Sequence, residues 1–484
     1  MMSQSRVFIV GAGTGLVENL TVKAKRLIET ADIIFYDRLI NPNILMLTDP
    51  KCKKVYVGKK PEGDFTPQDQ IIQYLKEASQ EYQTIVRLKS GDPYVFGRGG
   101  EEAMALAQEG ISFEVVPGVT SSIGGLSYAG IPMTYREVAL DFHVFTARSK
   151  EGDAEHDWEA ISRLKGTLVF LMGVKNLPKI TQALIDNGKN PTTPVAVVEW
   201  ASRSQQKLVV GTLETIYHKS TAATIKPPSL IVIGDVVKFN ESLNYFMNKP
   251  LFGRRFAIPQ SQAQLLLPLL EDLGSEVILF SSPTKVKAEL SLPLSDEGMD
   301  VCLLDGSALT AFINWMNKHQ TDWRHLKLKK LAVVGEHTQS ALESIGIHPD
   351  DYYKNLDALS YQSMNPDQIY IGSQESFNQL IRMNQVFEQA EFHSSSSEMF
   401  EKLENESSLE ALDGIIYSNT KAVRSIEQYF KDDHQKRQLQ QTPAYCLGEQ
   451  AYRELNRLGF NTVIQTKEPH YQSLQELLIH TAKK

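Results

Sequence analysis

The stretch KSGDPYVFGRGGEE, from Lys89 to Glu102, has the composition of a ligand-binding loop between a predicted strand and a predicted helix. The segment Gly91–Pro93 follows an apolar run, so its backbone can approach a flat ligand closely. Arg98 lies between two glycines, where neighbouring side chains screen little of its charge, although an ordinary exposed loop arginine explains it equally well. Glu101 and Glu102 suit the first turn of a helix, where negative charge is favoured. The pattern predicts ligand contact at this strand end.

A second glycine turn lies in VFIVGAGTGLVENLT, from Val7 to Thr21. Its glycines spell GxGxG, whereas the dinucleotide fingerprint is GxGxxG. The next predicted strand ends at Asp37, which a nicotinamide-binding site would place on a ribose hydroxyl. Taken alone, the turn favours a tight structural turn over a nucleotide site.

Two further strand ends carry groups that could contact a ligand. In VVPGVTSS, Thr120 and Ser121 offer hydroxyl groups, and helix capping is the structural alternative. Met172 ends the predicted strand in VFLMG, where an isolated methionine is more simply a core residue.

Composition narrows the class of protein. The chain has 484 residues, so about three or four domain-sized units are expected. A net charge of −8 argues against a general nucleic-acid binder but allows a local basic site for an acidic small molecule. The three cysteines, Cys52, Cys302 and Cys446, have no metal-ligand spacing, so we expect reduced thiols and no metal. With no signal-peptide pattern and no apolar run of about 20 residues, we expect a cytoplasmic protein without a membrane span.

Strand and helix patterns alternate through the first half, which predicts α/β domains with a largely parallel sheet. Ligands on such sheets bind beyond the carboxyl ends of the strands. A break at Asn240–Arg255 marks the expected domain boundary. The predicted strands are Val7–Val10, Ile33–Tyr36, Ile85–Leu88, Phe113–Val116, His143–Thr146, Leu168–Met172, Val195–Val198 and Leu230–Ile233.

The second half contains segments that resemble one another. LAVVGEHTQSALESIGI, from Leu331, and AYCLGEQAYRELNRLGF, from Ala444, each have a strand pattern, Gly-Glu, a helix pattern and Gly before an apolar residue. A second pair of similar segments precedes these two in order. One of them begins at Val301 and the other begins at Gly414. This order predicts a duplicated α/β unit within about 254–484.

The motifs of the first half occur together and in order in one known family. GAGTG, ENLTVKA, ADIIFYDRL, VGKK, RLKSGDPYVFGRGGEE, VVPGVTSS, GIPMTYRE, FLMG and PPSLIVIGDVV make residues 5–240 resemble the uroporphyrinogen-III C-methyltransferases of the tetrapyrrole methylase superfamily. The resemblance implies a two-lobed methylase fold over 1–245, with lobes of about 1–118 and 119–245. It also implies methylation of two ring carbons of uroporphyrinogen III by S-adenosylmethionine, which gives precorrin-2 for sirohaem and cobalamin biosynthesis.

The resemblance assigns roles to individual residues. Asp37 matches the proton acceptor, Lys59 the proton donor, and Arg98 an arginine that handles the substrate. The family's first loop normally reads GAGPGD, and this chain has Thr14 and Leu16 in place of the proline and the aspartate. Thr14 can still offer backbone and hydroxyl contacts. The cofactor contacts are expected at Thr14, Ser90, Gly91, Asp92, Val95, Thr120, Ser121, Met172 and Ala201.

This chemistry suits the residue types. A porphyrinogen carbon is electron-rich enough to attack a sulfonium methyl group directly, so the protein must align the reactants and remove a proton, for which Asp37 is the expected base. No metal is required. The many carboxylates of the substrate call for cations. Cations in or near the strand-end loops are Arg38, Lys59, Lys60, Arg98, Arg136, Arg148 and Lys175.

Residues 254–484 resemble uroporphyrinogen-III synthase, through RRFAIPQSQAQLLLPLLEDLGSEVILF, both Gly-Glu segments, IIYSNTKAVRSI and the ending VIQTKEPHYQSLQELL. The resemblance implies two α/β lobes that close hydroxymethylbilane into uroporphyrinogen III. Several positions depart from the family, among them Pro259-Gln260 and Leu303–Asp305. Ser418 and Thr420 are the candidate site residues, with turn and cap roles as the alternative. The second hypothesis is a non-catalytic tetrapyrrole-binding module.

The resemblance also bears on partners. We expect a small-molecule tetrapyrrole as substrate, no nucleic acid and no membrane. The family's methyltransferases are commonly homodimers, so a homodimer is expected here.

Overall fold

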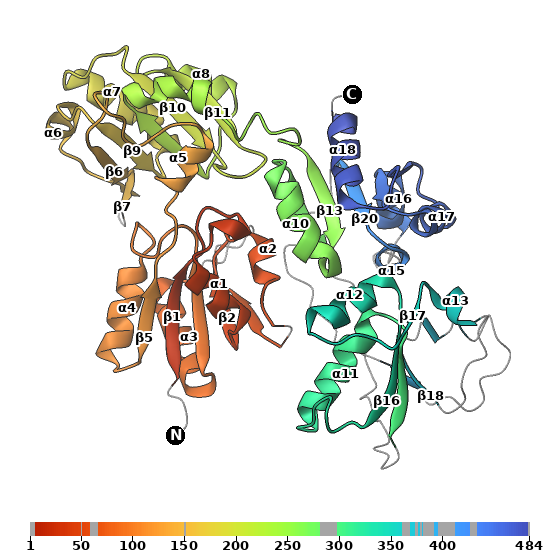
Figure 1. Cartoon of the computed structure of the whole chain (residues 1–484). Coiled ribbons are helices and arrows are strands. Elements are labelled where there is room, and N and C mark those ends of the chain that lie inside the picture. The colour runs from red at the N-terminus through yellow and green to blue at the C-terminus, as the bar shows by residue number, and fades with distance from the viewer. Residues whose placement is uncertain are drawn as a thin grey trace. The chain divides into compact units, whose positions relative to one another are not determined.

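The computed structural model describes residues 5–49, 51–58, 66–149, 152–280, 298–360, 368–372, 376–377, 380, 392–394, 412–425 and 433–482 (Figure 1). The chain divides into a larger unit, Met1–Ser282 with Lys402–Lys484, and a smaller unit, Pro283–Glu401. The larger unit holds three five-stranded sheets and a short hairpin, and the smaller unit holds one five-stranded sheet. Each unit is described by itself.

The first sheet is entirely parallel in the order β3-β2-β4-β1-β5. Its strands are β1 (Arg6–Gly11), β2 (Ile33–Tyr36), β3 (Lys53–Tyr56), β4 (Thr84–Lys89) and β5 (Phe113–Val116). Its helices are α1 (Val22–Glu29), α2 (Pro42–Leu45), α3 (Gln68–Glu81) and α4 (Gly99–Gln108). Parallel strands that are covered on both faces read as continuous apolar runs, and β2 has this pattern, IIFY, with all four residues buried.

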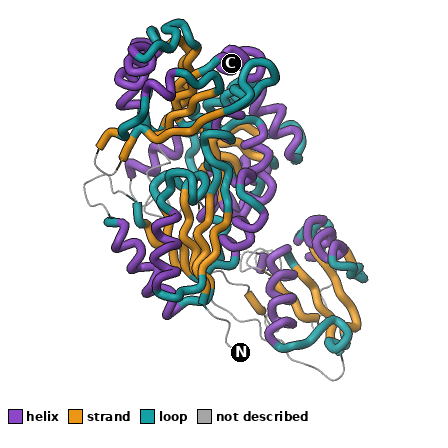
Figure 2. Tube along the Cα trace, turned by 90° about the vertical axis from the view of Figure 1, so that its left-hand side faces the viewer, coloured by secondary structure: helices purple, strands orange, loops and turns teal. Residues whose placement is uncertain are grey.

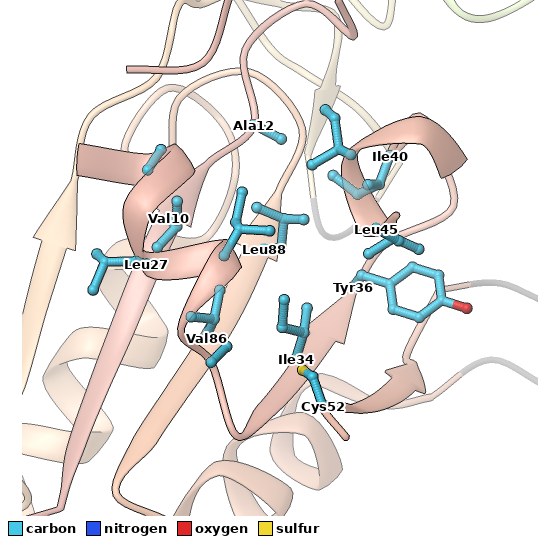
Figure 3. Close-up of a cluster of buried hydrophobic side chains, with 14 of the residues drawn as sticks. Val10, Ala12, Leu27, Ile34, Tyr36, Ile40, Leu45, Cys52, Val86 and Leu88 are labelled. Atoms are coloured by element: carbon cyan, nitrogen blue, oxygen red, sulfur yellow. The ribbon is translucent and has the colours of Figure 1, made fainter. Parts of the chain in front are cut away.

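Two cores cover the two faces of this sheet. Val10, Ile34 and Leu88 pack with residues of α1 and α2 on one face (Figure 3). Alternate residues of the same strands, including Ile9 and Ile33, pack with residues of α3 and α4 on the other. Because side chains alternate along a strand, this arrangement fixes which residues of β4 lie under α4.

The second sheet is mixed, in the order β11-β10-β12-β9-β6. Only β6 and β9 pair in parallel, whereas β10 is antiparallel to both neighbours and β12 is antiparallel to β9. Its strands are β6 (Phe142–Thr146), β9 (Thr167–Leu171), β10 (Pro194–Glu199), β11 (Lys207–Thr212) and β12 (Ser229–Ile233), and its longer helices are α5 (Gly124–Tyr128), α6 (Trp158–Ser162), α7 (Leu177–Asp186) and α8 (Ile216–Ala222). A short hairpin joins β7 (Arg148–Ser149) and β8 (Gly152–Asp153).

All eight strands predicted for the first half are confirmed to within one or two residues. The sequence pattern missed the two-residue strands β7 and β8, and it missed β3 and β11, which are edge strands of their sheets. Strands β3 and β11 each begin with lysine and contain no buried residue, so neither shows an uninterrupted apolar run.

The third sheet, in the larger unit, has the order β14-β13-β20-β21-β22, and the pairings in it are parallel. Its strands are β13 (Arg255–Pro259), β14 (Glu276–Phe280), β20 (Gly414–Tyr417), β21 (Ala444–Cys446) and β22 (Val463–Gln465). Its helices are α10 (Ala263–Asp272), α15 (Thr420–Ser425), α16 (Asp433–Gln441), α17 (Glu449–Arg457) and α18 (Tyr471–Ala482).

The fourth sheet, in the smaller unit, has the order β17-β16-β15-β18-β19, which matches the third sheet read in the opposite direction when β15 is set against β20, although the chain enters the two sheets at different strands. Its strands are β15 (Met299–Leu303), β16 (Leu328–Val334), β17 (Asp351–Tyr353), β18 (Gln368–Gly372) and β19 (Phe392–Ser394), with helices α11 (Gly306–Lys318), α12 (Glu336–Ser344) and α13 (Leu356–Ser360). Strand β15 corresponds to β20 and β16 to β21, as the repeated sequence segments predict. The duplicated α/β unit is therefore confirmed.

Figure 2 colours helices purple and strands orange and shows helices packed beside the strands of the sheets. The predicted fold class, α/β throughout, is confirmed. Within the described ranges, no helix is both long enough and apolar enough to span a membrane. The three cysteines are free and buried, and burial raises the pKa of Cys52 to about 11 and of Cys302 and Cys446 to about 12.

Candidate active site

Three glycines meet where β1, β4 and β5 end. A Cβ atom on Gly118 would lie 2.2 Å from the Gly91 carbonyl oxygen and 2.8 Å from the Gly11 Cα atom. A Cβ atom on Gly11 would lie 2.6 Å from both the Gly91 oxygen and the Gly118 nitrogen. Only glycine allows such an approach of three backbones. We call these three residues the glycine junction.

Loops from two strand ends are tied together at this junction. Gly13 and Gly91 exchange backbone hydrogen bonds, with N···O distances of 3.2 Å and 2.8 Å. Both have positive φ angles, +65° and +70°, which suit glycine. The Asp92 side chain accepts a hydrogen bond from the Gly118 N–H at 3.1 Å. Asp92 therefore joins the β4 loop to the β5 loop.

The expected cofactor contacts from other segments come to the same place. A Cβ atom on Gly91 would lie 3.9 Å from both Thr120 Cα and Ser121 N. A Cβ atom on Gly124 would lie 3.1 Å from the Thr14 methyl group. The structure thus gathers Thr14, Ser90, Gly91, Asp92, Thr120 and Ser121 at one edge of the first sheet.

Val95, Ala201 and Met172 are connected to this edge through the core of the second sheet. Val95 and Ala201 pack against the same buried cluster, which includes Leu171 at the end of β9. A Cβ atom on Gly125 would lie 2.9 Å from Ala201 Cβ and 3.7 Å from Ser121 Cβ. Met172 comes directly after Leu171 in the sequence; it is half exposed and has a φ angle of +57°. Taken alone, the sequence favoured a buried core position for this methionine, and its exposure differs from that expectation.

The glycine-rich loop after β4 is compact, and two of its glycines are required by packing. Cβ atoms on Gly97 and Gly99 would lie 2.9 Å and 2.5 Å from the Pro93 carbonyl oxygen, whereas one on Gly100 would meet nothing within 4 Å. Arg98 adopts the left-handed conformation between them, with φ 60°. Its guanidinium group donates to both Glu101 oxygens, at 2.9 Å and 2.8 Å. Arg98 is thus an exposed arginine that already has a carboxylate partner.

Asp37 lies just after β2, at the same carboxyl edge of the sheet. The Arg87 guanidinium group of β4 donates to Asp37 Oδ1 at 2.7 Å. The Asp37 side chain is 30% exposed, whereas the Arg87 side chain is 2% exposed. A largely buried cation therefore fixes one oxygen of a carboxylate that a ligand can still reach.

Sequence reasoning missed a buried charge cluster beneath Asp37. Glu102 Oε1 accepts from Arg87 Nε at 3.2 Å and from Lys89 Nζ at 2.9 Å, and the Glu102 side chain is fully buried. Arg87 and Lys89 alternate with apolar residues along β4, so both point toward α4, which carries Glu102. The available signal was two cations two residues apart inside a buried strand.

The electrostatics of this cluster follow from its burial. Burial lowers the pKa of Arg87, but the charges of Asp37 and Glu102 outweigh it, so the net shift is upward. Burial and then the neighbouring Arg87 lower the pKa of Lys89, although Glu102 acts in the opposite direction. Arg87 therefore remains a fixed positive charge under Asp37.

Lys59, the expected proton donor, lies outside the described residues. The chain leading to it runs beside Asp37, because β3 pairs with β2 and the Val57 N–H donates to Tyr36 O at 3.0 Å. A Cβ atom on Gly58 would lie 2.7 Å from the Arg38 nitrogen.

The synthase candidates lie where β20 gives way to α15. The Ser418 N–H donates to Gln262 Oε1 at 3.3 Å, and Thr420 is the first residue of α15. Asn419 caps this helix by accepting from the Ala422 N–H at 2.8 Å. These contacts are structural, and Ser418 and Thr420 remain a prediction as site residues.

Comparison with known proteins gives two family matches. The model of the tetrapyrrole (corrin/porphyrin) methylases matches residues 6–217, and that of uroporphyrinogen-III synthase HemD matches residues 266–476. The two matches fall on the two halves of the chain in the expected order.

Two relatives match more than half of this chain, and a solved structure matches about half of it. A uroporphyrinogen-III C-methyltransferase of Bacillus subtilis is 40% identical over 366 residues, which cover 72% of this chain and 74% of the relative. The porphyrin biosynthesis protein HemD of Ruminiclostridium josui is 33% identical over 362 residues, covering 72% and 71%. The solved uroporphyrin-III C-methyltransferase of Thermus thermophilus, complexed with S-adenosyl homocysteine, is 39% identical, covers 48% of this chain and 99% of its own, and has a TM-score of 0.43.

The Bacillus relative is aligned across most of both chains, and the methylase motifs gather at one sheet edge. The chain therefore belongs to the uroporphyrinogen-III C-methyltransferase family of tetrapyrrole methylases and carries a HemD uroporphyrinogen-III synthase domain in its C-terminal half.

Proposed function

We propose that this chain transfers methyl groups from S-adenosylmethionine to two ring carbons of uroporphyrinogen III, and that its C-terminal half makes this substrate from hydroxymethylbilane. The observation that carries the proposal is the glycine junction, which lies at the same carboxyl edge of one parallel sheet as Asp37. Backbone for the cofactor and a carboxylate for the reaction thus share one edge. The product would be precorrin-2, a precursor of sirohaem and cobalamin.

The residues at this edge fit the cofactor. Gly91 has no side chain to occupy the space beside Thr120 and Ser121, so backbone N–H and C=O groups of the β4 and β5 loops can contact a ligand directly. The hydroxyl groups of Thr14, Thr120 and Ser121 add further hydrogen-bonding groups. S-adenosylmethionine supplies, when bound, an electrophilic methyl group, which an electron-rich ring carbon takes while the electron pair of the broken C–S bond stays on sulfur.

Asp37 is suited to the remaining step. The methylated ring carries a positive charge and becomes neutral by losing one proton, which a carboxylate can accept. Arg87 holds Oδ1 of Asp37 at 2.7 Å and so limits the rotation of the carboxylate. With a 30% exposed side chain, Asp37 stays accessible to a ligand at the sheet edge.

The surroundings of the site suit an acidic macrocycle. The side chains of Tyr94 and Phe96, in the loop after β4, are 60% and 41% exposed, which offers apolar surface to a flat ligand. The exposed cations Arg38, Arg98, Arg136 and Lys175 can pair with substrate carboxylates. Because Glu101 already pairs with Arg98, a substrate carboxylate would share or replace that partner.

The runner-up function makes the C-terminal half a tetrapyrrole-binding module without turnover. It is favoured by the departures at Pro259-Gln260 and at Leu303–Asp305. The synthase reaction asks mainly for control of the shape of a flexible intermediate, so the loss of single side chains need not abolish it. We retain catalysis as the main proposal.

We also propose a cytoplasmic homodimer. The family resemblance supports the dimer, and three buried free cysteines suit a reducing compartment.

The full chain should convert hydroxymethylbilane and labelled S-adenosylmethionine into methylated type-III product. Ring closure is followed by isomer analysis, and methylation by label incorporation. Ready-made uroporphyrinogen III serves as the control substrate for methylation alone. If only the spontaneously closed type-I isomer forms while the control substrate is methylated, the synthase activity is refuted and the binding-module function remains.

Replacing Asp37 with asparagine should slow methylation of uroporphyrinogen III by about 100-fold, because the proton acceptor is lost. Asparagine can still accept a hydrogen bond from Arg87, so the affinity for S-adenosylhomocysteine, measured by calorimetry, should change little. Asp49→Asn, at an exposed position, is the control. An unchanged turnover number in Asp37→Asn would show that Asp37 is not the base.

Replacing Glu102 with glutamine should lower the free energy of unfolding by about 3 kcal/mol, because Arg87 and Lys89 would keep their buried charges without their common partner. The measurement is denaturant unfolding of the full chain, followed by hydrogen exchange in β4. Glu109→Gln, at the other end of α4, removes an exposed pair with Lys76 and should cost less than about 1 kcal/mol. Equal losses in the two variants would contradict the structural role of the buried cluster.

A further inference from the structure

Within the larger unit, the segment Ala12–Asn19 contacts the C-terminal half of the chain. We call this segment the cofactor loop, because it follows the glycine junction and contains Thr14. Val17 packs against the buried cluster that includes Phe256 of β13 and Leu266 of α10. A loop proposed to line the methyltransferase site therefore rests on the core of the third sheet.

Arg203 connects the same loop to β14. Its Nε atom donates to Glu276 Oε2 at 3.2 Å, and its Nη2 atom pairs with Glu276 Oε1. The two side chains are only 12% and 14% exposed. A Cβ atom on Gly15 would lie 3.3 Å from Arg203 Cδ and from Nη1, so the arginine covers the backbone of the cofactor loop at Gly15. The neighbouring Ser202 hydroxyl donates to Thr14 O at 2.8 Å.

A second carboxyl group also faces this arginine. Burial raises the pKa of Glu271 in α10 to about 8; the charge of Arg203 lowers it, and those of Glu276 and Glu18 raise it. Burial thus favours the neutral form of Glu271, and the carboxylate that Arg203 contacts is that of Glu276.

The cofactor loop is held from its other side through α2. The Asn41 amide donates to Gly15 O at 2.6 Å, just before α2 begins. The buried Asn43 amide, within α2, donates to Val277 O of β14 at 2.8 Å. Gln260 of the C-terminal half donates to Met46 O at 3.3 Å. Strand β14 thus contacts both supports of Gly15, Arg203 on one side and α2 on the other.

We propose that Arg203 and Glu276 are positioning residues of the methyltransferase, and that the third sheet acts as a brace that holds the cofactor loop in its binding conformation. Thr14 and Leu16 do not restrict the backbone as proline does, so the stiffness of this loop must come from its contacts. A loop fixed before the cofactor arrives loses less conformational entropy on binding, which strengthens affinity. The inference rests on the proposed placement of the cofactor over this loop.

The test uses the full chain with Glu276→Gln and Arg203→Lys. Both should raise the Kd for S-adenosylhomocysteine, measured by calorimetry, by about tenfold through loss of the paired geometry. The KM for S-adenosylmethionine should rise in parallel, while kcat at saturation stays within about twofold. Hydrogen exchange of the cofactor loop should be faster than in the unsubstituted chain. The Kd of the double variant should be no higher than that of the single variant with the higher Kd, because the two substitutions break the same interaction.

Glu159→Gln, which removes an exposed pair with Arg163 on α6, is the matched control and should leave the Kd unchanged. If Glu276→Gln lowers the melting temperature so far that binding cannot be measured, Arg203→Lys, which keeps its charge, carries the test. Unchanged Kd and exchange in the folded variants would overturn the brace. Failure of S-adenosylhomocysteine to protect the cofactor loop in the unsubstituted chain would instead overturn the proposed cofactor placement.

Discussion

Backbone contact among Gly11, Gly91 and Gly118 is the constraint on which the site depends. The Gly91 carbonyl oxygen lies 2.2 Å from where a Gly118 Cβ atom would be, so even alanine would force the strand ends apart. The contact brings together the loops that follow β1, β4 and β5, each of which carries expected cofactor contacts. Without it these residues would belong to separate loops. Close approach of backbone, rather than any one side chain, therefore builds the site.

A second constraint lies beneath the sheet edge, in the buried group of Arg87, Lys89 and Glu102. Burying charge is costly unless every member is paired, and Glu102 pairs with both cations. Arg87 in turn reaches Asp37 at the surface. The core of the first sheet thus determines the orientation of the one carboxylate to which a proton transfer is assigned. Stability and the proposed reactivity would thus depend on the same residues.

Much of the fold and part of the candidate site could be predicted from the sequence, for reasons that differ from residue to residue. The strands of the first half were predictable because parallel strands buried on both faces read as apolar runs, whereas the lysine-led edge strands β3 and β11 were not. Of the three glycines in the junction, Gly91 lies in the stretch that the sequence predicts to contact a ligand, but its contact with Gly11 and Gly118 depends on strand order. The contact of Arg87 with Glu102 was not foreseen, because the two residues meet only when α4 packs on β4. The contact of Val17 with the third sheet depends on packing far apart in the sequence.

The most direct measurement is a crystal structure of the full chain with S-adenosylhomocysteine. The proposed role of the glycine junction predicts that the ligand lies against the backbone of residues 90–92 and beside the hydroxyl groups of Thr120 and Ser121. Asp37 should then be accessible at the same sheet edge. A ligand bound elsewhere, or a junction covered by the protein's own side chains at saturating ligand, would contradict it.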